Sequence, residues 1–481
     1  MHCNRRSFIK TAAAGGLVWT VGPRNLVFGQ SSRTAPGPVS PGCRTGKVKV
    51  ARLFLGTPEG LWPKPGLDFR EEMEFYRRRM DSMQDGFGDV DFPVDTLVTS
   101  AEQAAGLSTR LADVDGILII HLSIGMMPAL REILGAGKPT VVFAVPYSGH
   151  EWVQFGRLMK EPLGSKLDCI LSSDTGGLAL AVRPFRAIHH LRDARILNVT
   201  TRDFSGTGDA VKAKFGTAIV PCPRERLLDA YAAVSEADAR READVWIRNA
   251  EAVVEPPEAD IVRSCRLALA LENLLDAEGA TALTIDCYGT MWNRTILLPA
   301  YPCYGFSRLN DLGWGGICES DLACAVTHAL FQGLTGRPGF ISDPTVDESD
   351  NRIILAHCLG STKMDGPRGP SAPYKIRTVM ERREGVVPQV EMRVGQKVTQ
   401  GILVGTDRLV YFTGTIVSTP VRLENDRGCR TQIAVKVDGD VNRLWRQWAG
   451  GLHRQTVYGD IRRELGMFCR FMDIQLMNEA V

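Results

Sequence analysis

Short apolar runs alternate with helical stretches in the chain from about residue 47 onward. Residues 48–55, 116–120 and 140–144 are short and mainly apolar, which favours buried strands. Residues 69–83 and 127–134, which lie between them, are predicted helices. Strands that alternate with helices in this way predict a parallel sheet with helices on both faces.

The same alternation continues and then gives way to a different pattern. Three further apolar runs, at 167–171, 195–199 and 217–220, suggest a second α/β unit, and a long helical stretch is predicted from residue 223 to about 278. After about residue 338, short strands follow one another with Gly and Asp turns and few helices between them, which predicts a β-rich module, such as an open barrel. The strands predicted there are 353–357, 374–380, 390–394, 401–404, 409–413 and 432–437.

The predicted fold class is therefore α/β, with two Rossmann-like α/β domains followed by a β-rich, barrel-like C-terminal domain. The changes in pattern place the N-terminal α/β domain at 47–165, the central α/β domain at 166–337 and the β-rich domain at 338–481. Residues 31–46 are rich in Ser, Pro and Gly and are a predicted linker.

Residues 1–30 have the pattern of a twin-arginine signal peptide. The run RRSFIK at 5–10 is followed by the apolar, Ala- and Gly-rich TAAAGGLVWTVG. Such a leader is removed, here near Gln30, and does not belong to the fold. We therefore expect a chain that folds in the cytoplasm and is then periplasmic or secreted. No other apolar run reaches the roughly 18 residues of a membrane span, so no span is expected in the mature chain.

Charge and cysteine usage narrow the function classes. The 481-residue chain has 57 Lys and Arg against 55 Asp and Glu, and four of the basic residues lie in the leader. Without those four, the chain has no excess of basic residues for binding a phosphate backbone, so nucleic acid is not an expected partner. The twelve cysteines are scattered without a CxxC pair. This favours buried free thiols over a disulfide scaffold and suits folding in a reducing cytoplasm.

Residues of metal-ligand type gather in the second half of the chain. Glu319 follows the Gly-rich turn LGWGG and precedes an apolar helix, and Asp343 ends one apolar strand while His357 ends another. His453 lies in GGLHRQTVYGD at 450–460, which resembles a loop entering a final strand of the chain. Taken singly, each has a structural explanation: complementing a helix dipole for Glu319, starting a turn for Asp343, and filling the core for a lone histidine.

Taken together, these residues resemble the L-fucose/L-arabinose isomerase superfamily. The resemblance is strongest over 283–360 and 450–465 and is carried by CESD at 318–321, AHC at 356–358 and HRQTVYGD at 453–460. It implies two α/β domains and a β-rich C-terminal domain, an active site where these meet, and a homo-oligomer, either a trimer or a hexamer.

The resemblance also implies a reaction and its parts. The reaction is aldose–ketose isomerisation of a small open-chain sugar through an enediolate, assisted by Mn²⁺ or another divalent cation. Glu319 and Asp343 would be both metal ligands and proton carriers, and His357 and His453 would be ligands. The specific sugar stays open, because Asp at 343 is the fucose-type residue whereas His357 is arabinose-type.

Weaker candidates for substrate binding lie elsewhere. His121 and Tyr147 each follow a predicted strand of the first sheet, where open α/β sheets hold ligands. Trp62 is a candidate for stacking on a sugar face, and Arg308 precedes Glu319. Each also has a core or loop-shaping explanation. The pair His189-His190 lies on a predicted helix and is expected at the surface.

Two alternatives remain. A metal-dependent sugar lyase, epimerase or dehydratase of the same fold would use the same ligands, because enediolate stabilisation serves all of these reactions. A non-catalytic periplasmic carbohydrate-binding protein is the other alternative, although sugar binding alone needs no paired carboxylates at a metal.

Overall fold

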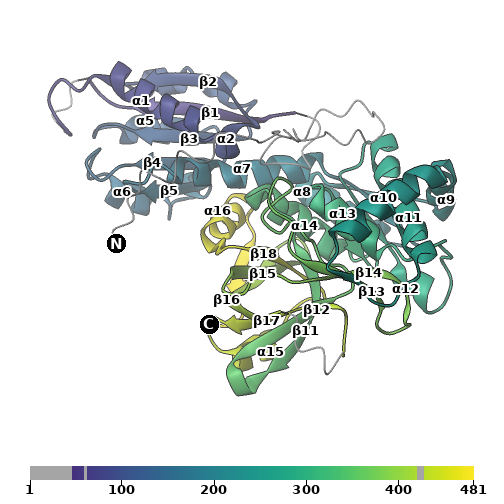
Figure 1. The fold of residues 1–481 in the computed structure, drawn as a ribbon. Helices are drawn as coiled ribbons and strands as arrows, with labels where there is room; N and C mark the ends of the chain where they lie inside the picture. Colours follow the sequence, from purple (N-terminus) through teal and green to yellow (C-terminus); the bar gives the residue numbers. More distant parts are fainter. Residues whose placement is uncertain (1–45, 59–61, 420–426) are drawn as a thin grey trace, which may run out of the picture. The chain divides into compact units, whose positions relative to one another are not determined.

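The computed structural model describes residues 46–58, 62–419 and 427–481, which form two parallel sheets, a small three-stranded sheet and an antiparallel barrel (Figure 1). The predicted leader, 1–30, and nearly all of the predicted linker lie outside the described residues. The strands are β1 Val48–Leu55, β2 Val90–Val98, β3 Gly116–His121, β4 Thr140–Ala144, β5 Leu167–Leu171, β6 Arg195–Val199, β7 Ala218–Pro221, β8 Ala252–Val253, β9 Ala282–Ile285, β10 Gly315–Cys318, β11 Phe340–Asp347, β12 Arg352–His357, β13 Tyr374–Val379, β14 Glu384–Val390, β15 Lys397–Val404, β16 Arg408–Ser418, β17 Thr431–Val437, β18 Arg454–Tyr458 and β19 Gln475–Asn478. The helices are α1 Phe69–Ser82, α2 Gln84–Phe87, α3 Ala101–Ala105, α4 Ser108–Leu111, α5 Met127–Leu134, α6 Trp152–Leu158, α7 Gly177–Asp193, α8 Ser205–Phe215, α9 Arg224–Ala233, α10 Glu236–Asn249, α11 Glu258–Ala277, α12 Cys287–Met291, α13 Cys303–Asp311, α14 Leu322–Thr335, α15 Val441–Gln447 and α16 Arg462–Met472.

The first sheet has the strand order β2-β1-β3-β4-β5, and all of its pairings are parallel. Side chains alternate across β1, so Leu53 and Leu55 pack in one apolar cluster with α3 and α5. Val50 and Phe54 pack in a second cluster with α1 and α7. The predicted parallel sheet covered on both faces is thereby confirmed. Its order is the second common doubly wound arrangement and differs from the Rossmann order.

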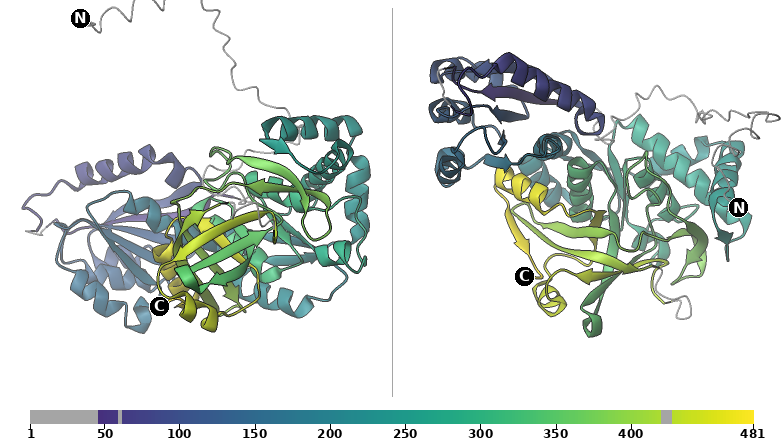
Figure 2. Two further views of the ribbon diagram at one scale, coloured as in Figure 1. Left: turned by 60° about the horizontal axis from the view of Figure 1, so that its bottom comes forward. Right: turned by 60° about the vertical axis from the view of Figure 1, so that its left-hand side comes forward.

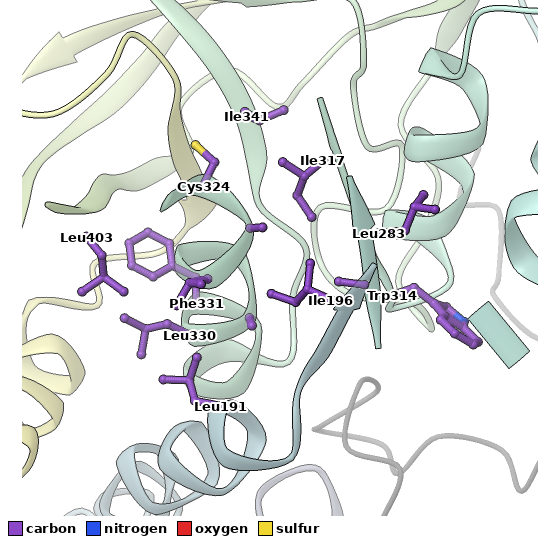
Figure 3. Close-up of a cluster of buried hydrophobic side chains, with 14 of the residues drawn as sticks. Leu191, Ile196, Leu283, Trp314, Ile317, Cys324, Leu330, Phe331, Ile341 and Leu403 are labelled. Atoms are coloured by element: carbon purple, nitrogen blue, oxygen red, sulfur yellow. The ribbon is translucent and has the colours of Figure 1, made fainter. Parts of the chain in front are cut away.

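The second sheet has the order β10-β9-β6-β7, again all parallel. Helix α14 lies between this sheet and the barrel, because its Phe331 shares one buried cluster with Ile196 and Ile317 of the sheet and with Leu403 of β15 (Figure 3). Gly316 of β10 lets α13 approach closely, since a Cβ there would lie 2.5 Å from the Cα of Phe306.

The C-terminal strands close into a barrel, drawn in green to yellow in Figure 2. The order is β15-β18-β11-β12-β17-β16, and an additional β15–β16 pairing completes the ring. These pairings are antiparallel. The predicted β-rich module is confirmed, with a closed ring of strands rather than the open barrel expected, and β19 adds to β16 in parallel.

Some sequence-based predictions are wrong. The strand at 167–171, assigned to the central domain, pairs with β4 and completes the first sheet. The helical stretch predicted over 223–278 is divided into α9, α10, β8 and α11. The strand predicted at 390–394 is wrong as well, because Val390 ends β14. His189 and His190 are buried rather than at the surface, because α7 packs against both the first sheet and α14.

Two composition-based expectations concern the described ranges. All ten cysteines there are free, and eight of them are buried, which confirms the expectation of buried thiols for these residues. In the same ranges, no helix combines the length and apolar character that crossing a bilayer requires.

Candidate functional site

Glu319 directly follows the end of β10, in a tight turn that leads into α14. Glu319 and Ser320 both have left-handed backbone conformations, with φ of 62° and 52°. Arg202 fixes this turn by donating a hydrogen bond to the Glu319 carbonyl over 2.7 Å. Asp321 then caps α14 by accepting the Cys324 N–H over 2.9 Å. The Glu319 carboxylate is thus placed by backbone geometry.

The barrel brings three further residues together by strand pairing. Asp343 on β11 pairs with Ala356 of β12, so His357 lies one residue along from it. Ser342 on β11 pairs on its other side with Arg454 of β18, and His453 immediately precedes Arg454. Because β11 lies between β12 and β18, residues separated by about a hundred positions meet at one place.

The four predicted ligands gather in one cluster. The Nε2 atom of His453 is 3.8 Å from a Glu319 carboxylate oxygen and 3.5 Å from one of Asp343. It is also 3.2 Å from Nε2 of His357. Potential ligand atoms of Asp343, His357 and His453 all lie within 4.8 Å of one another, as do those of Cys318, Glu319 and His357.

A cavity of about 480 Å³ opens at this cluster. Its lining is mixed polar and apolar and includes Arg202, Phe204, Thr207, Tyr288, Glu319, Ser320, Asp321, Leu322, Ala323, Asp343, Leu452 and His453. His357 lies behind His453 and is 3% exposed. A small polar molecule in the cavity would therefore meet both carboxylates and the His453 ring.

The cluster concentrates negative charge in a partly buried place. Burial raises the pKa of Glu319; His453 opposes this, and the carboxylates of Asp343 and Asp321 add to it. Burial likewise raises the pKa of Asp343, opposed by His453 and reinforced by Glu381 and Asp321. Burial lowers the pKa of His453, but its hydrogen bond to Asp321 and the nearby carboxylates outweigh this and raise it overall. Carboxylates held this close together repel one another, and a bound cation would relieve that repulsion.

The donor set fits a divalent metal at three of the four residues. His453 Nδ1 is 3.3 Å from the Asp321 carboxylate, so an Nδ1–H can donate to Asp321 and leave Nε2, which lies near Glu319 and Asp343, to bind a metal. A metal-binding histidine often donates its other ring N–H to a carboxylate, which fixes the orientation of the ring. His357 differs, because its Nδ1 accepts the Cys358 backbone N–H over 2.8 Å and its Nε2 therefore carries the proton. Burial and the neighbouring His453 hold the pKa of His357 well below its usual value.

The predicted substrate-binding residues do not line this cavity. His121 is 2% exposed and is hydrogen-bonded to Glu151 over 2.5 Å and to Ser148 over 3.1 Å. Trp62 packs on His150, with ring centroids 4.6 Å apart, and Tyr147 is 75% exposed at the same edge of the first sheet. Trp62 lies in the loop after β1, His121 ends β3 and Tyr147 lies in the loop after β4. The prediction that they contact a ligand in this cavity therefore finds no counterpart in the geometry.

Arg308, the fourth predicted substrate-binding residue, is not among the residues that line this cavity. Its guanidinium lies buried in α13, where Nε donates to Glu242 over 2.9 Å and Nη1 contacts Glu272. Two of the guanidinium nitrogens, Nε and Nη1, are thereby engaged in ion pairs between helices. Arg308 stabilises the packing of α10, α11 and α13 rather than a ligand.

Sequence reasoning missed Arg202, which lines the cavity, and its partner Asp286. Arg202 follows β6, and Asp286, which forms an ion pair with Arg202 over 3.1 Å, follows β9. Glu319 follows β10 in the same sheet. The rule that ligands bind at the carboxyl ends of parallel strands was applied to the first sheet, whereas the site lies at the second. Applied to both sheets, the rule would have found these residues.

Comparison with known proteins points to one class, the sugar isomerases. No family model matches the chain. The chain is similar to a sulfoquinovose isomerase from Clostridium sp. (strain MSTE9), with 26% identity over 302 residues. The matched region covers 58% of this chain and 63% of that protein, so the similarity spans less than two thirds of either.

Proposed function

We propose that this chain is a divalent-metal-dependent aldose–ketose isomerase acting on an open-chain sugar. The observation that carries the proposal is the convergence of Glu319, Asp343 and His453 on one cavity, with His453 held by Asp321. The similarity to a sulfoquinovose isomerase supports the same class of reaction.

Glu319, Asp343 and His453 would hold the metal, for which we propose Mn²⁺, since oxygen-rich ligands with an imidazole suit that ion. When bound, the cation would polarise the sugar carbonyl and stabilise negative charge on the neighbouring oxygens. His357, whose Nδ1 accepts the Cys358 N–H and whose Nε2 therefore carries the proton, would lie beside the cation as a neutral ring rather than as a ligand.

The two carboxylates would move the proton. Isomerisation takes a proton from C2 of the aldose and returns one to C1, so it needs a base that can hold a proton and give it back. Burial and neighbouring anions raise the pKa values of Glu319 and Asp343. In the metal-free site this makes each carboxylate a stronger base, whereas a bound cation would act in the opposite direction on the pKa.

The substrate class that we propose rests on Arg202, the arginine among the described residues that line the cavity. Arg202 lines the cavity and is half-exposed although it pairs with Asp286. A guanidinium suits an anionic group such as a sulfonate, and the similar protein is named for a sulfonated sugar. We therefore propose an acidic aldose, sulfoquinovose included, as the substrate class to test first.

The experiment is NMR of the Mn²⁺-loaded protein in D₂O with neutral aldoses and sulfoquinovose. An isomerase forms the ketose and introduces deuterium at the carbons that exchange protons, without loss of water or carbon. Glu319→Gln is expected to lower the rate at least about 10²-fold, whereas Glu74→Gln, on the exposed face of α1, leaves it unchanged. Loss of water or carbon would indicate a dehydratase or lyase, and inversion without a ketose an epimerase. Binding without turnover would leave a carbohydrate-binding protein.

We further propose that the chain acts as a homo-oligomer, a trimer or a hexamer, and that it is exported. Both proposals rest on the sequence alone, the first on the family resemblance and the second on the RRSFIK segment.

A further inference from the structure

A second group of metal-ligand type lies beside the candidate site. Cys358 directly follows His357 at the end of β12, and Cys429 lies two residues before β17. Glu381 lies in the turn between β13 and β14. One ligand atom from each of these residues lies within 4.8 Å of both others. Three segments far apart in the sequence therefore bring two thiols and a carboxylate to one point.

The spacing of these atoms suits a tetrahedral ion. The Cys429 sulfur is 3.2 Å from one Glu381 oxygen, and the Cys358 sulfur is 3.9 Å from the other. Zinc bonds of about 2.3 Å to sulfur and about 2.0 Å to oxygen, at tetrahedral angles, separate ligand atoms by roughly 3.5–3.8 Å. The two sulfur–oxygen distances lie within about 0.4 Å of the roughly 3.5 Å expected for such a pair, so small side-chain rotations would complete the site.

The surroundings favour a soft cation. Cys358 packs with Cys303, Val379 and Val387 in a small buried cluster, and Cys429 is partly buried against it. Sulfur ligands in an apolar wall select zinc-like ions, whereas the oxygen-rich set of Glu319 and Asp343 suits manganese. The exposed Glu381 leaves an entry path from solvent.

We propose that Cys358, Cys429 and Glu381 form a second cation site, specific for a thiophilic divalent ion such as Zn²⁺ and separate from the proposed catalytic site. Both cysteines bind as thiolates, and their two protons pass to solvent. Three protein ligands leave one position for water. The site does not depend on the isomerase proposal, because it shares no ligand with the cluster of Glu319, Asp343 and His453.

The experiment uses Co²⁺ as a coloured substitute for Zn²⁺ in the reduced, metal-free protein under anaerobic conditions. Thiolate bound to Co²⁺ gives an intense near-ultraviolet charge-transfer band, which oxygen and nitrogen ligands do not give. We expect this band in the unaltered chain and in a Glu319→Gln, Asp343→Asn double variant, in which only the proposed catalytic site is removed. Added Zn²⁺ is expected to displace the Co²⁺ and abolish the band.

Cys429→Ser should abolish the band, and Glu381→Gln should weaken Co²⁺ binding at least about tenfold. Cys169→Ser is the matched control, because Cys169 is also partly buried and lies in β5 of the first sheet. Thermal melts verify that each variant is folded. Absence of the band in the reduced unaltered chain, or its persistence in folded Cys429→Ser, would overturn the proposal. If the double variant loses isomerase activity but keeps the band, the two sites are separate, and the second-site proposal stands.

Discussion

Glu319 and Ser320 occupy the left-handed backbone conformation, which costs a residue with a side chain about 1–2 kcal/mol. The cost is offset by the hydrogen bond from Ser320 N–H to the Ile285 carbonyl over 3.1 Å and by the Arg202 contact to the Glu319 carbonyl. Strained positions cluster where a side chain must be aimed at a ligand. The strain here falls on the residue proposed as both metal ligand and base.

Asp321 has two separate tasks, and one substitution distinguishes them. One carboxylate oxygen caps α14, and the other accepts from His453 Nδ1. Asp321→Asn keeps a good cap, so the free energy of unfolding should change by less than about 1 kcal/mol. The amide cannot support the His453 ring as a carboxylate does, so Mn²⁺ affinity should fall about 10- to 100-fold. Calorimetric titration and thermal melts measure the two effects, and unchanged affinity would show that Asp321 only caps the helix.

At the scale of residues, the sequence identified the side chains with candidate chemistry but not the neighbours that hold them in place. The four clustered residues were found because the resemblance connected them across the chain. Arg308 was misplaced because Glu242, its buried partner, lies 66 positions earlier, and no local spacing indicates such a pair. Asp321 was missed because a helix cap is sufficient reason for an Asp in that position.

At the scale of elements, the packing of α7 against α14 makes the stability of the fold depend on pH. Gly333 of α14 approaches α7 so closely that a Cβ there would lie 3.3 Å from that of His190. Burial lowers the pKa of His190 to about 4, and burial also lowers that of His328 to about 4. The unfolded chain, with histidine pKa values near 6.5, therefore binds more protons between pH 4 and 6.5, and stability falls as the pH drops through this window.

His190→Gln should reduce that loss of stability. The expected loss between pH 7 and pH 5 is about 2 kcal/mol for each such histidine. Denaturant unfolding at both pH values should show a smaller difference in the variant than in the unaltered chain. His150→Gln, at an exposed position, is the control. If the His190→Gln variant lost as much stability between pH 7 and pH 5 as the unaltered chain, His190 would not be a source of the pH dependence.

The elements themselves were predicted where apolar runs are unbroken. β1, β4, β5 and β6 have the predicted bounds because each is a short, mainly apolar run. β2 was missed because Pro93 and several polar residues interrupt its pattern, and β1 itself has a register shift opposite this region. α7 was recognised as a helix, but its burial on two sides was not, since ion pairs such as His189–Asp115 hide its polar residues.

For the molecule as a whole, the proposed twin-arginine leader makes a prediction that can be tested in cells. Replacing Arg5 and Arg6 together by Lys should retain the chain in the cytoplasm, because the twin-arginine receptor reads that pair. Arg24→Lys, in the same leader, should leave export unchanged. Immunoblots of periplasmic and cytoplasmic fractions measure the distribution. Periplasmic accumulation of the Arg5→Lys, Arg6→Lys variant would contradict a twin-arginine route.

The central claim is that residues from the second sheet and the barrel hold one divalent cation, and Mn²⁺ binding measured by electron paramagnetic resonance tests it most directly. The account predicts one tightly bound Mn²⁺ per chain, abolished by Glu319→Gln, Asp343→Asn or His453→Gln and only weakened by His357→Gln. A chain that binds no stoichiometric Mn²⁺, or that binds it equally well after Glu319→Gln, would contradict the account.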